Sequence, residues 1–257
     1  MACEDQISSV AAATPSVDDK TRRFFEVMRA LVVGGIFGGA LLIGVGSRVA
    51  MLILRVTSPD NVRGVKSDDG FVIGRVTLAG TYNLMLIGAS FGIIGAGAYL
   101  MVRRWLIGPL WFRRLTTGLA AGAVVGSMLI HADGVDFSRL GPAWFAIGLF
   151  IALPAVFGWF IGSVVDSITR QGSWTSTGRT RWVLPIVLIA LFPLTVVVVM
   201  FAAPIVCGWV VVSDLGVVQR IRRSAPHALV IRAMWLSVAL VGLVAVVGDA
   251  HAVLTRR

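Results

Sequence analysis

Two polar segments hold the residue types that could carry out chemistry in this chain. His131, Asp133 and Asp136 follow one apolar stretch, and Asp68 and Asp69 lie in a polar segment between two others. An imidazole beside carboxylates can bind a divalent metal, and an aspartate can serve as a general base. These five residues are therefore the candidates for a catalytic site. Their spacing matches no metal motif such as HExxH, so no metal and no cofactor are indicated.

Each segment also has a purely structural interpretation. The Asp-Asp-Gly of residues 68–70 is typical of a turn, and residues 131–137 are typical of a polar exit from a membrane helix. A third polar segment contains Arg220, Arg222 and Arg223. Guanidinium groups recognise anionic groups such as lipid headgroups or phosphate. The same arginines also fit a solvated or interfacial loop.

The composition indicates the class of protein. The chain has 257 residues, of which 57% are hydrophobic and 14% are charged. A soluble domain is about 45–50% apolar and about 25% charged, so this composition excludes a soluble globular enzyme and indicates an integral membrane protein. Lys and Arg outnumber Asp and Glu by 23 to 13. In a membrane protein such an excess lies against anionic headgroups and sets topology, so we expect membrane lipid as a partner and no nucleic acid.

The apolar stretches predict an all-α integral membrane protein with about six transmembrane helices. A helix needs roughly 20 residues to cross the hydrocarbon core. Residues 1–23 are polar and predict a disordered cytoplasmic tail, and residues 24–257 predict a single polytopic transmembrane domain. The predicted spans are 27–47, with a helical extension to Arg55, then 81–102, 115–130, 142–165, 182–212 and 228–248.

The fifth of these stretches, 182–212, is too long for one straight helix. Its 31 residues carry no charge and include Pro185, Pro193 and Pro204. Proline interrupts or bends a helix because it lacks a backbone N–H and clashes with the preceding turn. We expect a span that ends near Ala203, followed by a bent or re-entrant piece that reaches Val212.

The first loop and the basic residues predict the topology. Residues 62–76 alternate apolar and polar positions around an Asp-Gly pair, which predicts a short extracytoplasmic β-hairpin between the first two helices. With six spans and a cytoplasmic N-terminus, 13 Lys and Arg lie on the cytoplasmic side and eight lie outside, with Arg48 and Arg232 in the predicted helices counted on neither side. The positive-inside rule then favours a cytoplasmic N-terminus and a cytoplasmic C-terminus. The aspartate segments and Arg220–Arg223 would lie outside.

Small residues recur every four positions in the predicted helices. This spacing places them on one helix face, where backbones can approach closely. It predicts helix packing within the chain, or contact with a protein partner or a second copy through GxxxG faces. A flexible, glycine-lined pathway is the alternative. The residues are Gly34, Gly38, Gly35, Gly39, Gly88, Gly92, Gly118, Gly122, Gly126, Gly158 and Gly162.

Three segments carry a resemblance. Residues 55–59, 67–74 and 131–137 look like segments of uncharacterised bacterial multi-pass membrane proteins. The resemblance covers about the first two-thirds of the chain. It implies the membrane class alone, and it carries no functional residue over to this sequence.

Three hypotheses for function follow. The leading one is a multi-pass protein of the bacterial plasma membrane that acts as a non-enzymatic accessory, assembly or sensing component. The second is a small-solute transporter or channel, because discontinuous helices often build transport sites. The third is a membrane-embedded enzyme that acts on a lipid-linked substrate at the outer face. Whether the protein is an enzyme stays open, with the balance against it, since no Walker A loop, CxxC pair or serine nucleophile elbow stands out.

Overall fold

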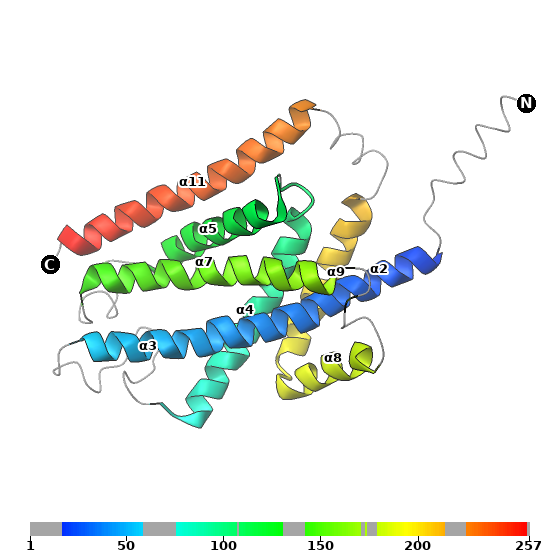
Figure 1. The fold of residues 1–257 in the computed structure, drawn as a ribbon, viewed down its shortest axis with the longest axis horizontal. Coiled ribbons are helices and arrows are strands. Elements are labelled where there is room, and N and C mark those ends of the chain that lie inside the picture. The colour runs from blue at the N-terminus through cyan, green and yellow to red at the C-terminus, as the bar shows by residue number, and fades with distance from the viewer. Residues whose placement is uncertain are drawn as a thin grey trace, which may run out of the picture.

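The computed structural model describes residues 17–58, 76–106, 108–130, 142–170, 173, 179–213 and 225–255. Every regular element in these ranges is a helix, and they contain no strand (Figure 1). Five helical stretches in them are long and apolar enough to cross a membrane: Thr21–Thr57, Leu78–Val102, Ala143–Ile168, Thr195–Ser213 and Leu236–Val253. The described part of the chain is therefore all-helical, with apolar helices as expected for the membrane protein that the composition predicts.

The predicted β-hairpin at residues 62–76 is not confirmed. All of it except Val76 lies outside the described residues. Val76 itself is not in a strand, and a helix begins two residues later at Leu78.

The first helix is one long element that contains two π-helical stretches. It begins as α2 (Val17–Arg29), continues through the π-helical η1 (Ala30–Ile36) and η2 (Gly39–Val45), and ends as α3 (Gly46–Thr57). Its start at Val17 lies inside the segment 1–23 that the sequence predicts to be a disordered tail. The extension to Arg55 that we expected is present. The predicted pair Gly34/Gly38 faces residues 160–168, whereas the pair Gly35/Gly39 lies in the π-helical stretches against another, neighbouring helix.

That neighbour is α4 (Leu78–Val102), which crosses the first helix (Figure 1). Thr77 caps its N-terminus by accepting a hydrogen bond from the Gly80 backbone N–H at 3.2 Å. At the other end the chain turns at Gly108, whose φ of +93° lies in the left-handed region that glycine tolerates. The next helix, α5 (Leu110–Leu129), follows directly after this turn.

Helix α5 is not among the five apolar spans, yet it lies between two long helices. It packs against α7 (Ala143–Ile168) on one side and α11 (Ala225–Thr255) on the other (Figure 1). A Cβ atom added at Gly118 would lie 2.7 Å from the Ala155 carbonyl oxygen. One added at Gly242 would lie 3.1 Å from the Ala123 carbonyl carbon. The backbones therefore touch on both sides of α5, which supports its assignment as a further helix of the bundle.

The 182–212 stretch differs from its prediction. It forms α8 (Thr180–Leu191), a turn at residues 192–194, and α9 (Thr195–Ser213). The prediction of a span that ends near Ala203 is therefore wrong, because the break lies at Pro193 and residues 205–212 continue α9.

Side chains explain why the break falls there. The Thr195 hydroxyl donates to the Phe192 carbonyl at 2.6 Å, and the Tyr82 hydroxyl donates to the Leu191 carbonyl at 2.8 Å. These bonds satisfy carbonyl groups that the helix end leaves without intrahelical partners. Pro204 lies inside α9 without ending it, as proline does in many membrane helices.

Helices α8 and α9 form a hairpin that leaves and returns at one end of the bundle. At the start of α8, the Trp182 ring meets the Phe25 ring of α2, with centroids 5.6 Å apart. At the end of α9, the Trp209 indole donates to the Met101 carbonyl of α4 at 3.0 Å. Both contacts lie near the ends of α2 and α4 that carry the arginines described below.

The opposite end of the bundle holds the last described residues. Val253 packs in one buried cluster with Leu54, Ile130 and Ala143. Helix α2 and the end of α11 therefore lie at opposite ends of the molecule (Figure 1). The cytoplasmic position of both termini stays a prediction. The Pro193 turn makes a returning hairpin from a stretch that we counted as one crossing.

Candidate functional site

An arginine-lined pocket lies where five parts of the chain meet. It has a volume of about 780 Å³ and is bordered by α2, the turn after α4, the start of α5, and the last turns of α7 and α9. Five of its lining residues are arginines and two are carboxylates. The lining residues are Arg22, Arg23, Glu26, Val27, Arg103, Arg104, Leu106, Arg113, Asp166, Thr169 and Val210.

The arginines of the α4–α5 connection are held by neighbouring helices. Arg103 donates to the Thr169 hydroxyl of α7 at 2.8 Å, and Arg104 donates to the Ser213 hydroxyl of α9 at 2.5 Å. Arg113 donates to the backbone carbonyl of Arg103. Each guanidinium therefore has at least one fixed contact, which sets its direction.

One carboxylate of the pocket is engaged by two helices. Asp166 of α7 accepts a hydrogen bond from the Tyr99 hydroxyl at 2.9 Å and lies 3.6 Å from the Arg114 Nε. Gly162 makes room for this contact, since a Cβ there would lie 3.2 Å from the Tyr99 ring. The negative charge of Asp166 is thus partly balanced by Arg114, which is not one of the five lining arginines.

Burial affects one of these cations, Arg103. It lowers the pKa of the Arg103 guanidinium, and the neighbouring charges of Arg104 and Arg113 lower it further, while Asp166 acts in the opposite direction. Arginine ordinarily titrates far above neutral pH. The cost of burying the Arg103 charge favours an anion beside it.

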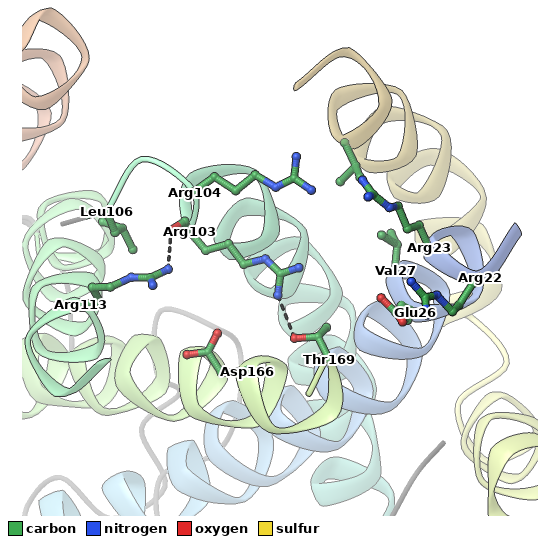
Figure 2. A pocket seen from close by; sticks show the side chains of 11 residues that line it. Arg22, Arg23, Glu26, Val27, Arg103, Arg104, Leu106, Arg113, Asp166 and Thr169 are labelled. Atoms are coloured by element: carbon green, nitrogen blue, oxygen red, sulfur yellow. Dashed lines mark hydrogen bonds between the residues drawn. The ribbon is translucent and has the colours of Figure 1, made fainter. Parts of the chain in front are cut away.

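The remaining arginines approach from the first helix. Figure 2 shows Arg22, Arg23 and Glu26 on α2, across the pocket from Arg103 and Arg104, whose side chains extend toward α2. Arg29, one turn further along, donates to the Ile168 carbonyl at the end of α7 at 3.3 Å. This contact ties α2 to α7 at the C-terminal end of α7, where cations are favoured.

The sequence-predicted polar residues lie elsewhere. Asp68, Asp69, His131, Asp133 and Asp136 are all outside the described residues, so the predicted catalytic cluster stays a prediction. Within the described ranges no group of three or more His, Cys, Asp or Glu side chains could hold a metal ion. Arg220, Arg222 and Arg223 are likewise outside the described residues.

The predicted packing glycines lie at helix contacts. A Cβ at Gly35 would be 2.7 Å from the Ile93 Cα, and one at Gly38 would be 3.0 Å from the Ile161 side chain. A Cβ at Gly158 would lie 2.7 Å from the Ala121 Cβ. Similar close neighbours surround the rest of the set: Gly34, Gly39, Gly88, Gly92, Gly118, Gly122, Gly126 and Gly162. Each of these contacts is between helices of this chain.

The sequence interpretation missed the pocket. Its arginines were counted only as markers of membrane topology: Arg22, Arg23, Arg103, Arg104 and Arg113. One signal was available: the 103–114 connector concentrates arginine and tryptophan, and a single aspartate, Asp166, ends the apolar stretch of α7. Nothing in the sequence indicates that α2 lies beside them.

Comparison with protein-family models, with curated proteins and with solved structures finds no match to this chain.

Proposed function

We propose that this protein is a non-enzymatic accessory, assembly or sensing component of the bacterial plasma membrane, and that it binds a phosphate-bearing anion in the arginine-lined pocket. The phosphate of an anionic lipid headgroup is the ligand that its position favours. The observation that carries the proposal is the excess of five lining arginines over two carboxylates. Apart from Arg113 on α5, these charged residues lie on or directly after helices whose apolar stretches are long enough to cross a membrane.

The chemistry of the lining fits a phosphate group. Guanidinium groups bind phosphate oxygens with two parallel hydrogen bonds, and such charge-assisted bonds are stronger than neutral ones. The contacts of Arg103 with Thr169 and of Arg104 with Ser213 hold the two side chains before a ligand arrives. Less conformational entropy is then lost on binding.

The positive-inside rule supports a cytoplasmic position for the pocket. The segment between Ser213 and Ala225, which contains Arg220, Arg222 and Arg223, joins two helix ends on the pocket side. When these arginines are assigned there, and Arg256 and Arg257 to the opposite side, the Lys and Arg count becomes 14 against seven instead of 13 against eight. The larger bias favours a cytoplasmic N-terminus and an outer C-terminus.

The test is lipid-dependent stability of the full chain. Purified protein in phosphatidylcholine nanodiscs is mixed with increasing phosphatidic acid, and its melting temperature is followed by intrinsic fluorescence. A ligand that binds only the folded state raises this temperature. We expect a rise for the unaltered protein, a rise at least several-fold smaller for R103Q/R104Q, and an unchanged rise for R55Q.

The variant R103K/R104K keeps both positive charges and serves as the check that substitution at these two positions still allows folding. R55Q is the matched control because Arg55 is exposed and lies near the opposite end of the first helix. If phosphatidic acid stabilises R103Q/R104Q as much as the unaltered protein, the pocket is not the binding site. If it stabilises none of the proteins, the proposal is wrong.

The transporter hypothesis has one observation in its favour, the break between α8 and α9. The break lies beside Tyr82, about one turn from the start of α4, whereas transport sites built from broken helices lie near the middle of the membrane. Liposome flux assays test this alternative. The enzyme hypothesis depends on aspartates outside the described residues. Loss of an enzymatic activity in the D133N variant would be its first support.

A further inference from the structure

The pocket arginines form two groups that face each other. The first group is Arg22 and Arg23 on α2, and the second group is Arg103, Arg104 and Arg113 around the α4–α5 connection (Figure 2). The two groups are far apart in sequence and belong to different helices. They meet because the start of the first helix lies beside the ends of α4 and α7.

The size of the pocket exceeds one phosphate. Its volume is about 780 Å³, which lies within the roughly 300–1,000 Å³ typical of small-molecule sites. A phosphate has five heavy atoms. Even if each took the ~30 Å³ share of a liquid water molecule, a single phosphate would fill less than about a quarter of this space. One phosphate bound to the second group would leave the first group without a ligand contact.

The charge of the pocket also favours two phosphate groups over one. Its five arginines and two carboxylates leave a formal excess of three positive charges. One phosphate ester carries about −1.5 to −2 at pH 7, which is smaller than the formal excess of the lining residues. Two linked phosphate groups come closer to balance.

The three apolar lining residues show what else the ligand meets. Val27, Leu106 and Val210 border the same pocket, and Val27 and Val210 are buried. An organic group attached to the phosphates would therefore contact apolar surface. Both a lipid tail linked through a diphosphate and the nucleoside of a nucleotide satisfy this requirement.

We infer that the pocket binds a diphosphate group, with one phosphate held by Arg103, Arg104 and Arg113 and the other by Arg22 and Arg23. This inference rests on the proposed anion-binding function, and it adds the chemical class of the ligand. It also gives Arg22 and Arg23 a specific role. They select a second phosphate rather than adding to a general positive charge.

The experiment compares two inorganic probes on the full chain in phosphatidylcholine nanodiscs. Calorimetric titrations with pyrophosphate and with orthophosphate are run at one fixed ionic strength, because salt screens such interactions. We expect pyrophosphate to bind at least about tenfold more tightly than orthophosphate, which corresponds to about 1.4 kcal/mol.

Paired variants separate the two arginine groups. R22Q/R23Q should weaken pyrophosphate binding about tenfold and change orthophosphate binding less than threefold, whereas R103Q/R104Q should weaken both. R22K/R23K keeps the charges and should recover part of the lost affinity. Circular dichroism and melting without ligand check that each variant folds.

A second arm distinguishes the source of the diphosphate. Diacylglycerol diphosphate in the nanodisc is compared with phosphatidic acid, and ADP in solution is compared with AMP. Preference for either diphosphate over its monophosphate supports the inference and identifies the source as lipid or soluble. If neither diphosphate ester binds, the inference of a biological diphosphate ligand is wrong.

The outcomes also separate this inference from the proposed function. Equal affinity for pyrophosphate and orthophosphate, or an equal loss of both in R22Q/R23Q, overturns the diphosphate assignment and leaves a single-phosphate site. Failure of every anion, inorganic or lipid, to bind overturns the proposed function as well.

Discussion

The contact between the first helix and α4 gives the sharpest test of the fold. Gly39 of η2 faces Gly88 and Gly92 of α4, so the two helices meet there through backbone atoms alone. A Cβ atom added at Gly39 would lie 2.7 Å from the Gly92 Cα and closer still to the Gly88 carbonyl oxygen. The variant Gly39→Ala introduces this atom and nothing else.

The expected magnitude follows from these distances. Carbon atoms pack best at roughly 3.5–4.0 Å, so the two helices must separate by about 1 Å to admit the methyl group. A gap of that size forfeits about a quarter to a half of each affected contact, and overpacking of this kind costs typically about 1–3 kcal/mol. Alanine regains up to about 1 kcal/mol through its higher helix propensity. We therefore expect a net loss of about 2 kcal/mol in the free energy of unfolding.

The assay is reversible unfolding in mixed micelles by titration with sodium dodecyl sulfate, followed by tryptophan fluorescence. The matched controls are Gly148→Ala in α7 and Gly208→Ala in α9, since a Cβ at either position meets nothing within 4 Å. They should leave the stability unchanged or raise it by up to about 1 kcal/mol. If Gly39→Ala unfolds at the same detergent fraction as Gly148→Ala, the backbone contact between η2 and α4 does not exist as described, and the reasoning is refuted.

Two further predictions concern the orientation and the pocket. Alkaline phosphatase fused after Arg257 should be active, and one inserted in the segment between α9 and α11 should be inactive; the reverse pattern would contradict the proposed orientation. Asp166→Asn removes a negative charge that borders the pocket, and loss of a like charge favours a bound anion. Pyrophosphate should therefore bind at least about 3-fold more tightly to D166N than to the unaltered protein at low salt, which corresponds to roughly 0.6 kcal/mol. Weaker binding in the same titration would show that Asp166 is not oriented as the pocket geometry requires.

Local sequence patterns anticipate the membrane class and most helix positions. The 81–102 and 142–165 stretches were predicted to within a few residues of α4 and α7, because a long apolar run in lipid has no alternative to a helix. The GxxxG spacing also identifies residues at helix contacts. It does not say which helix each face meets, since the same spacing occurs in four helices.

The position of the break in the 182–212 stretch could not be read from its prolines. Pro185, Pro193 and Pro204 look equivalent in sequence, yet only Pro193 ends a helix. The difference is tertiary, because Tyr82 of α4 supplies a donor to the Leu191 carbonyl and its ring stacks on Phe192 with centroids 6.0 Å apart. A proline breaks a membrane helix where a neighbour can satisfy the backbone groups that the break exposes.

Tertiary contacts also decide whether the arginines only mark membrane topology or form a binding site. Counted along the sequence, Arg22, Arg103 and Arg113 mark ends of separate helices, and each is explained by a membrane surface alone. A topology signal needs only that they share one side of the membrane. The pocket needs more, because Arg103 must reach Thr169 on α7 and Tyr99 must reach Asp166 past Gly162. Such contacts fix the directions of buried charges at a cost that general attraction to headgroups does not require, and this is the reason to assign the cluster a ligand of defined shape.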